Sequence, residues 1–332
     1  MLELLLIAFI IAVALAFDVG NGMNDAANSI STVVATGVLT LRQAALMAAA
    51  FNFIGPFVFG VSVATTIAKG IVVQELVSEF VILGGLVGAI LWVYLATYWG
   101  VPVSASHSLI GGLLGSAIMA SGLKAVIFPG RLLDTLLFIF LAPLIGLLLG
   151  FFIQAGLLWV FRRQSPSRIN RYFRRLQLLS VAAYSMGHGT NDAQKVMGII
   201  SLLLFSAGML GPQFYVPAWV IFASATAICV GTFIGGYRVV HTLGIRTTKL
   251  RPINGFCAET AGASLLFATS HFGIPVSTTH TITGSIMGVG VTRRVSAVRW
   301  TIARRIFYSW ILTIPIAMAA GGLAYLAVSA FG

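Results

Sequence analysis

Apolar runs separated by short polar stretches extend along the whole chain. Most of these runs reach about 20 residues, the length that an α-helix needs to cross the hydrocarbon core of a membrane. Alternating segments of about ten residues, which would predict a membrane β-barrel, do not dominate. The pattern therefore predicts an all-α polytopic membrane protein with about ten membrane segments. These segments are 2–38, 43–68, 76–98, 102–122, 131–161, 177–209, 215–241, 252–273, 275–291 and 300–330.

Two short polar motifs each occur twice inside these runs. Residues 20–26 read G-N-G-M-N-D-A, and residues 187–193 read G-H-G-T-N-D-A. Residues 102–107 read P-V-S-A-S-H, and residues 275–280 read P-V-S-T-T-H. The two motifs return in the same order and at nearly the same offset, which indicates an internal repeat.

The repeat divides the chain into two parts. The first repeat covers residues 1–161 and the second covers 177–332, with a basic cytoplasmic linker at 162–176. Five crossings in each part would leave the two repeats inverted relative to each other. Inverted repeats are typical of secondary transporters, which bind their substrate at the repeat interface near the middle of the bilayer.

Basic residues gather in three of the polar stretches. The chain has 20 Lys and Arg against 8 Asp and Glu, and fifteen of the 20 lie within 162–175, 238–251 and 293–305. By the positive-inside rule these are cytoplasmic loops, which places both termini outside a multi-pass protein of the cell's inner (plasma) membrane. This placement argues against a nucleic-acid partner. Soluble proteins carry about 25% charged residues, so the 8% found here exclude a water-exposed fold.

Segments 2–38 and 177–209 are longer than one regular crossing requires. Each contains a G-x-G-x-N-D motif partway along, and its glycines would permit the backbone to unwind. We therefore predict discontinuous helices at both motifs. Whether 102–122 and 275–291 cross fully or form re-entrant hairpins is left open by the pattern.

The first motif pair carries amides and carboxylates that can bind ions. Oxygens of these groups suit a hard cation such as sodium, whereas amide N–H groups suit an oxyanion, especially at a helix N-terminus. Buried carboxylates are costly in lipid, so two matched copies favour function over a structural polar cluster. The residues concerned are Asn21, Asn24, Asp25 and Asn28 in the first copy, and His188, Asn191, Asp192 and Lys195 in the second.

The second motif pair carries hydroxyl groups after a proline. These hydroxyls could surround a tetrahedral anion once water is excluded, although Ser and Thr at such positions also cap helices. The two histidines either bind the ligand or orient its neighbours. The residues are Ser104, Ser106 and His107 in the first copy, and Ser277, Thr278, Thr279 and His280 in the second.

Acidic residues outside the motifs receive weaker interpretations. Glu259 has no acidic counterpart in the first half, and it either faces water at the interface or serves an ion or proton path. Asp18 and the remaining acids lie near predicted segment ends, where we expect them to be solvated.

These four motifs resemble those of the PiT family of inorganic phosphate transporters. The family signature G-[AN]-N-D-[VA]-x-N is similar to residues 22–28 and 189–195, and its P-[VI]-S-x-T-H elements are similar to 102–107 and 275–280. The resemblance implies a symporter for phosphate, or for sulfate in some members. It further implies about twelve helical pieces, in ten segments with breaks, and coupling to sodium or protons. A homodimer in the lipid bilayer and no enzymatic activity are expected as well.

Three residues depart from the family pattern. Met23 replaces a small residue, and Ala105 replaces a hydroxyl residue in the first hydroxyl motif. Lys195 replaces the Asn of sodium-coupled eukaryotic relatives, so its ammonium group could stand in for a bound cation or contact the anion. This argues against two equivalent sodium sites and favours protons, while a sodium ion at Asn24, Asp25 and Asn28 remains open.

The substrate and the class of protein follow from the same residues. Near neutral pH phosphate keeps a proton and can donate a hydrogen bond to Asp25 or Asp192, whereas sulfate cannot. This favours phosphate if one of the two carboxylates faces the anion rather than a cation. An uncoupled anion channel would avoid the carboxylates, and an intramembrane enzyme would need one asymmetric catalytic cluster. The sequence thus predicts a secondary active symporter that imports inorganic phosphate with H⁺ or Na⁺, needs no other cofactor, and works by alternating access.

Specific roles are expected for the motif residues. The expected substrate-binding residues are Asn24, Asp25, Ser104, Ser106, Asn191, Asp192, Lys195, Ser277, Thr278 and Thr279. The expected coupling-ion residues are Asn21, Asp25, Asn28, Asp192 and Glu259, with His107, His188 and His280 in support.

Overall fold

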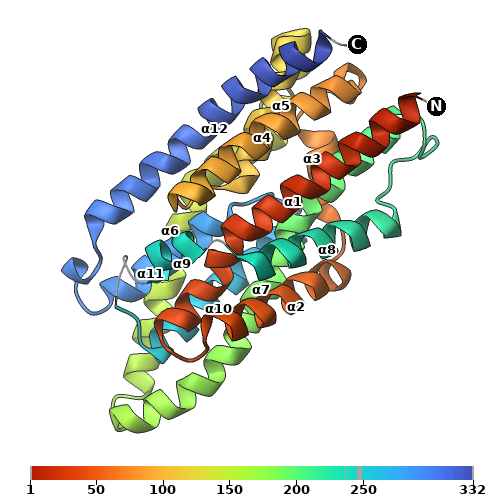
Figure 1. Cartoon of the computed structure of the whole chain (residues 1–332). Coiled ribbons are helices and arrows are strands. Elements are labelled where there is room, and N and C mark those ends of the chain that lie inside the picture. Colours follow the sequence, from red (N-terminus) through yellow and green to blue (C-terminus); the bar gives the residue numbers. More distant parts are fainter. Residues whose placement is uncertain (1, 236, 245–248, 331–332) are drawn as a thin grey trace.

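A computed structural model describes residues 2–235, 237–244 and 249–330, which fold as a bundle of twelve α-helices (Figure 1). Arg246, in the second basic stretch, lies outside the described residues. The helices are α1 (Leu2–Ala35), α2 (Leu41–Phe59), α3 (Ser62–Gly70), α4 (Glu79–Trp99), α5 (Ala105–Ser121), α6 (Gly130–Val160), α7 (Pro166–Ser206), α8 (Ala218–Ile234), α9 (Tyr237–Gly244), α10 (Pro252–His271), α11 (Thr278–Val291) and α12 (Trp300–Ser329).

The predicted apolar runs correspond to these helices. Two runs are each divided into a pair of helices at a glycine with positive φ: Gly60 (75°) separates α2 from α3, and Gly235 (68°) ends α8 before α9. The expectation of about twelve helical pieces in an all-α fold is therefore confirmed. Five helices (α1, α2, α4, α6 and α12) are long and apolar enough to cross a membrane by length and composition.

The prediction that α1 and α7 break at the G-x-G-x-N-D motifs is wrong. Both helices run through the motif without interruption. A Cβ atom on Gly22 would lie 2.5 Å from the carbonyl oxygen of Ile228, and one on Gly189 would lie 2.2 Å from that of Asn52. The motif glycines thus let α1 pack directly against α8, and α7 against α2, as small residues do between membrane helices.

The backbone leaves the helical conformation at the hydroxyl motifs instead. Short non-helical segments connect α4 to α5 and α10 to α11, and the hydroxyl motifs lie at the starts of α5 and α11. The predicted linker at 162–176 is mostly helix, because α7 begins at Pro166, a favoured residue for the first turn.

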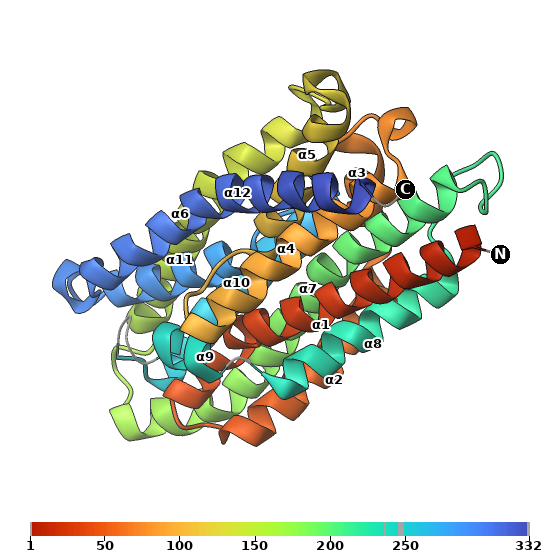
Figure 2. The same ribbon diagram turned by 45° about the horizontal axis from the view of Figure 1, so that its top comes forward.

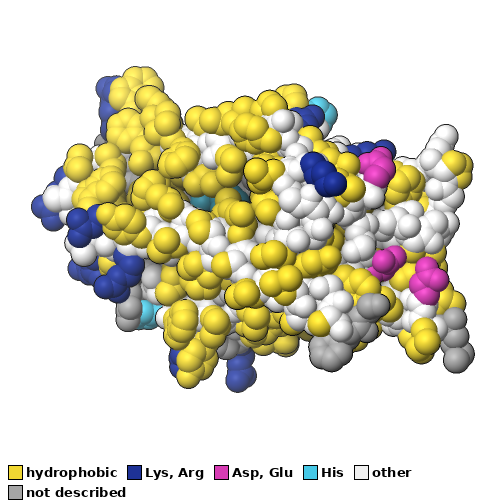
Figure 3. Space-filling view, turned by 90° about the horizontal axis from the view of Figure 1, so that it is seen from above, with side chains coloured by type: hydrophobic (Ala, Val, Ile, Leu, Met, Phe, Trp, Pro, Cys, Tyr) yellow, Lys and Arg dark blue, Asp and Glu magenta, His cyan; other side chains and the backbone are white. Residues whose placement is uncertain are grey.

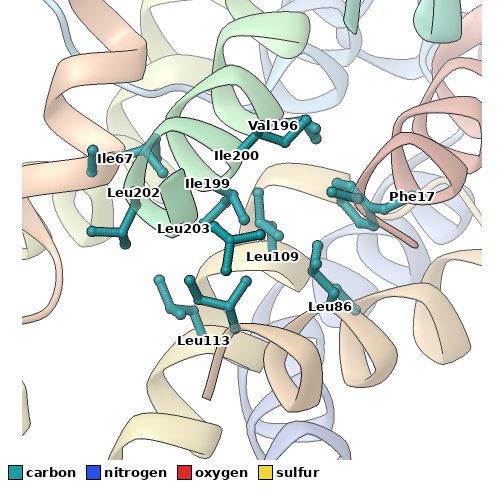
Figure 4. Packing of buried hydrophobic residues seen from close by; sticks show 14 of the residues in the cluster. Phe17, Ile67, Leu86, Leu109, Leu113, Val196, Ile199, Ile200, Leu202 and Leu203 are labelled. Carbon is teal, nitrogen blue, oxygen red and sulfur yellow. The ribbon is translucent and has the colours of Figure 1, made fainter. Parts of the chain in front are cut away.

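The two halves of the chain are interleaved. The last helix of the second half, α12, packs on α4 and α5 of the first half, and α6 packs on α10 and α11 (Figure 2). In the same way α1 packs on α8 and α2 packs on α7. A cluster of buried side chains joins α1, α4, α5 and α7, with Phe17, Leu86, Leu109 and Val196 among its members (Figure 4). The inverted relation of the repeats stays a prediction.

The two ends of the bundle differ in charge. Figure 1 places both termini at one end and the α6–α7 and α11–α12 connections at the other. Lys and Arg gather at one end of the molecule, acidic side chains lie toward the other, and the surface between them is mainly hydrophobic (Figure 3). Large apolar side chains on this surface are exposed, among them Phe152 (65%) and Leu179 (68%). This distribution fits a surface that faces lipid.

Candidate functional site

The two motif carboxylates meet in the interior of the bundle. Asp25 on α1 and Asp192 on α7 are buried, and the hydroxyl of Thr278 at the start of α11 lies between them. Thr278 Oγ1 is 3.1 Å from Asp25 Oδ2 and 3.2 Å from Asp192 Oδ2. Because a hydroxyl has one proton, it can donate to only one carboxylate at a time.

Each amide–carboxylate motif contacts the hydroxyl motif of the other half. From the first copy, Asn28 Nδ2 donates to Thr279 Oγ1 at 3.0 Å, and the same hydroxyl is 3.3 Å from Asp25 Oδ1. From the second copy, the Lys195 ammonium donates to the hydroxyl of Ser106. The sequence predicted these residues as a site, and the structure brings them together across the two halves.

Lys195 is the buried cation at this centre. Its ammonium group also donates to the Asp192 carboxylate, and to the carbonyl oxygen of Val276 at 3.2 Å. The side chain is 1% exposed. An ammonium group buried inside a membrane protein needs such partners because its desolvation is costly.

The starts of α5 and α11 lie beside this centre. Ser104 and Ser277 are the N-caps, and each accepts a hydrogen bond from the backbone N–H of the histidine three residues later, at 3.2 and 3.3 Å. Ser104 and Ser277 therefore act as helix caps. Ser106, Thr278 and Thr279 instead contact the charged side chains of the centre. First-turn N–H groups and the positive ends of both helix dipoles make this region suitable for an anion.

A chain of hydrogen bonds leads from Thr232 to His188, which lies beside Asp192. The Thr232 hydroxyl donates to a backbone carbonyl at 2.8 Å and so accepts from Asn52 Nδ2 at 2.8 Å, which turns Asn52 Oδ1 toward His188 Nδ1 at 3.1 Å. His188 Nε2 then faces Asp192 Oδ2 at 3.1 Å. Sequence reasoning missed Asn52 and Thr232; their only signal is a polar residue inside an apolar run.

The other two histidines join the hydroxyl motifs to each other. The rings of His107 and His280 meet edge to face with centroids 4.8 Å apart, and His280 stacks on Trp310 at 3.9 Å. This packing fits an orienting role. Asn191 is directed away from the centre, since its amide donates to Ser270 Oγ at 3.4 Å.

Glu259 belongs to a separate buried cluster. Its carboxylate accepts hydrogen bonds from Thr32 (2.6 Å), Gln177 (2.9 Å) and Ser180 (2.5 Å). The side chain does not face water. Asp18, which we expected to be solvated near a segment end, is also fully buried, so that expectation is wrong; α1 places it on the face that packs against α8.

Buried carboxyl groups outnumber buried ammonium groups within the described part of the chain. Four carboxylates (Asp18, Asp25, Asp192 and Glu259) and one ammonium group, that of Lys195, are less than 3% exposed. Asp25, His188 and Asp192 each offer a ligand atom, and these atoms lie within 4.8 Å of one another. Two carboxylates and an imidazole could hold a cation, and such a donor set fits the missing positive charge.

These features define a helical membrane transporter whose charged, hydroxyl-lined centre lies where two helices begin. The chain matches the phosphate transporter family over residues 21–321, and it belongs to that family. It is 50% identical to a protein of Rhizobium meliloti (strain 1021) named as a probable low-affinity inorganic phosphate transporter, over 97% of this chain and 96% of that one. A protein of Bacillus subtilis (strain 168) with the same name is 41% identical, over 97% of each chain.

A solved structure shares the fold. It is described as a sodium-dependent phosphate transporter, and it superposes with a TM-score of 0.86 at 26% sequence identity, over 98% of this chain and 99% of that one. The resemblance to phosphate transporters seen in the motifs is therefore confirmed, and the chain is a multi-pass membrane protein of this class.

Proposed function

We propose that the protein imports inorganic phosphate by symport with a monovalent cation, H⁺ or Na⁺, in the plasma membrane. The observation that carries this proposal is the excess of buried carboxylates beside groups that bind anions. Phosphate would lie between Ser106 and Lys195 on one side and Asn28, Thr278 and Thr279 on the other.

Electrostatics supports the need for a coupled cation. Like charges about 4 Å apart repel by about 4 kcal/mol at an effective dielectric constant of about 20. Lys195 offsets the charge of Asp192, to which it donates, whereas Asp25 contacts only uncharged donors in Asn24, Thr278 and Thr279. A phosphate anion entering this centre adds negative charge, and a proton or sodium ion at Asp25 would remove that penalty.

Asp25 also favours phosphate over sulfate. Hydrogen phosphate carries a proton that it can donate to this carboxylate, whereas sulfate offers acceptors only. Burying a carboxylate against an acceptor oxygen leaves both groups unpaired, which is costly away from water. We therefore propose phosphate as the substrate, with sulfate as the alternative within the same family.

The interleaved halves suggest how access alternates. Each amide–carboxylate motif contacts the hydroxyl motif of the other half. A shift of one half against the other would therefore break and re-form both sets of contacts together, and so expose the site to one face of the membrane and then to the other. We propose a homodimer with the basic connections in the cytoplasm, both termini outside, and no nucleic-acid partner.

Uptake of radiolabelled phosphate into proteoliposomes tests the proposal. A sodium gradient and a proton gradient are imposed separately, and unlabelled sulfate is added as competitor. Symport predicts that at least one gradient accelerates uptake and drives accumulation above equilibrium, and the effective gradient identifies the ion. Uptake that neither gradient accelerates would contradict symport, and preferential inhibition by sulfate would contradict the choice of substrate.

A further inference from the structure

A second buried carboxylate lies on α1 outside the proposed phosphate site. Asp18 precedes Asp25 by two helical turns, about 10 Å along the axis. Its side chain is fully buried, and neither carboxylate oxygen has a hydrogen-bond partner. An unpaired ionised carboxylate in such a place is among the most costly groups that a membrane protein can bury.

Two polar neighbours of Asp18 are also without partners. Asn21 on α1 and Ser224 on α8 lie close enough to interact with the carboxylate, and they are 1% and 0% exposed. Neither the Asn21 amide nor the Ser224 hydroxyl makes a hydrogen bond of regular geometry. Three adjacent buried polar side chains without well-formed hydrogen bonds call for an explanation, and a bound ion is one that fits.

The charged residues around Asp18 do not neutralise it. Asp192 and Lys195 on α7 act on the carboxylate with opposite signs, and the ammonium group of Lys195 already donates to Asp192 and Ser106. At the equivalent position of the second motif copy stands Ser185, so the second half offers no matching carboxylate. When ionised, Asp18 therefore adds one negative charge that the described basic side chains do not balance.

The contact between α1 and α8 beside this cluster is close. A Cβ atom on Gly231 would lie 2.1 Å from the carbonyl oxygen of Val19, so the two backbones touch. A compact ion bound directly by protein oxygen atoms fits beside such a close contact without a hydration shell.

We propose that Asp18, Asn21 and Ser224 form a binding site for one sodium ion, separate from the phosphate site. The cluster offers up to four hard oxygen ligands: two from the carboxylate, one from the amide and one from the hydroxyl. A metal ion can be bound by all four oxygen atoms together, whereas a proton on Asp18 can be donated to only one acceptor, the amide or the hydroxyl oxygen. One carboxylate balances a monovalent ion, while a divalent ion would leave a net positive charge in the membrane.

The role of this ion in transport rests on the proposed cation coupling, but its binding does not. The test uses the purified full-length protein in detergent, with the Asp25→Asn background to remove the central cation site. Thermal unfolding is followed as NaCl replaces choline chloride at constant ionic strength and pH. The Asp25→Asn protein should be stabilised by about 5 °C at a sodium concentration about a hundredfold above its Kd.

Adding Asp18→Asn should abolish this sodium-specific shift, and ²²Na⁺ binding should fall by one ion per chain. Ser224→Ala should weaken sodium binding while the number of bound ions stays the same. The matched control is Asp134→Asn, which alters an exposed carboxylate paired with Arg131 and should change neither result.

Sodium stabilisation that survives in the Asp18→Asn, Asp25→Asn protein would overturn the site, as would stabilisation that lowering the pH reproduces without sodium. Failure of symport gives a different pattern: uptake would ignore both gradients while ²²Na⁺ binding at Asp18 persisted.

Discussion

Replacing Lys195 with Asn tests whether its ammonium group acts as a built-in cation. Asn28 holds the equivalent position in the first copy of the motif, so Lys195→Asn makes the two copies alike there. The substitution removes the donor to Asp192 and Ser106. Asp192 would retain only its contacts with His188 and Thr278.

The expected cost follows from the burial of this pair. Removing one partner of a buried ion pair costs about 3–5 kcal/mol, because the remaining charge is uncompensated. At about 1.4 kcal/mol for each factor of ten, phosphate binding should weaken by about a hundredfold to a few thousandfold when no cation replaces the ammonium group. A small cation entering beside Asp192 should restore much of this loss.

The assay is phosphate uptake into proteoliposomes, with KM measured at low and high sodium and at two pH values. Lys195→Asn should raise KM by at least about a hundredfold at low cation concentration. The KM of the Lys195→Asn protein should fall again as the cation is added. One more cation should then be transported per phosphate than in the wild-type protein. Lys124→Asn, which changes an exposed lysine in a short 3₁₀ turn, is the control. A Lys195→Asn protein with wild-type KM at low cation concentration would refute the reasoning.

Three further substitutions separate packing, binding and support. Gly22→Ala should lower the thermal midpoint by several degrees, since its Cβ would meet the Ile228 carbonyl and overpacking costs about 1–3 kcal/mol. The control Gly156→Ala should leave the midpoint unchanged, because no atom lies within 4 Å of the added Cβ. Equal midpoints for the two variants would contradict the packing argument. Ser106→Ala should raise KM for phosphate by roughly tenfold, the value of one hydrogen bond to a charged group; an unchanged KM would place the anion elsewhere. Glu259→Gln should reduce maximal uptake with little change in KM, because its partners lie outside the phosphate cluster; a raised KM in uptake assays would show direct involvement.

Much of the site could be predicted from the sequence because its residues come from matched copies. Asp25, Asp192 and Lys195 stand out as charged residues in apolar runs, and Ser106 and Thr278 belong to a repeated motif. Burial makes such groups expensive, so repetition alone is a strong signal. Which residues of each motif meet could not be predicted, since that depends on how the two halves interleave.

Other features depend on neighbours that the local sequence does not reveal. Gly22 and Gly189 fit both an unwound helix and a close helix contact, and only the backbones of α8 and α2 decide between them. Ser104 and Ser106 differ in role because Ser104 is the N-cap of α5, whereas Ser106 is the second residue of that helix. The prediction that Asp18 is solvated failed because its apolar segment is longer than one membrane crossing. The sequence pattern therefore does not show how deep in the membrane Asp18 lies.

The most direct measurement locates the anion itself. Crystals of the protein soaked with arsenate, a tetrahedral analogue of phosphate, can be examined by anomalous diffraction at the arsenic edge. The account predicts one strong peak per chain within hydrogen-bonding distance of Ser106 and Thr278, next to the Lys195 ammonium group. A peak confined to the basic connections, in crystals of protein that is active in transport, would contradict it.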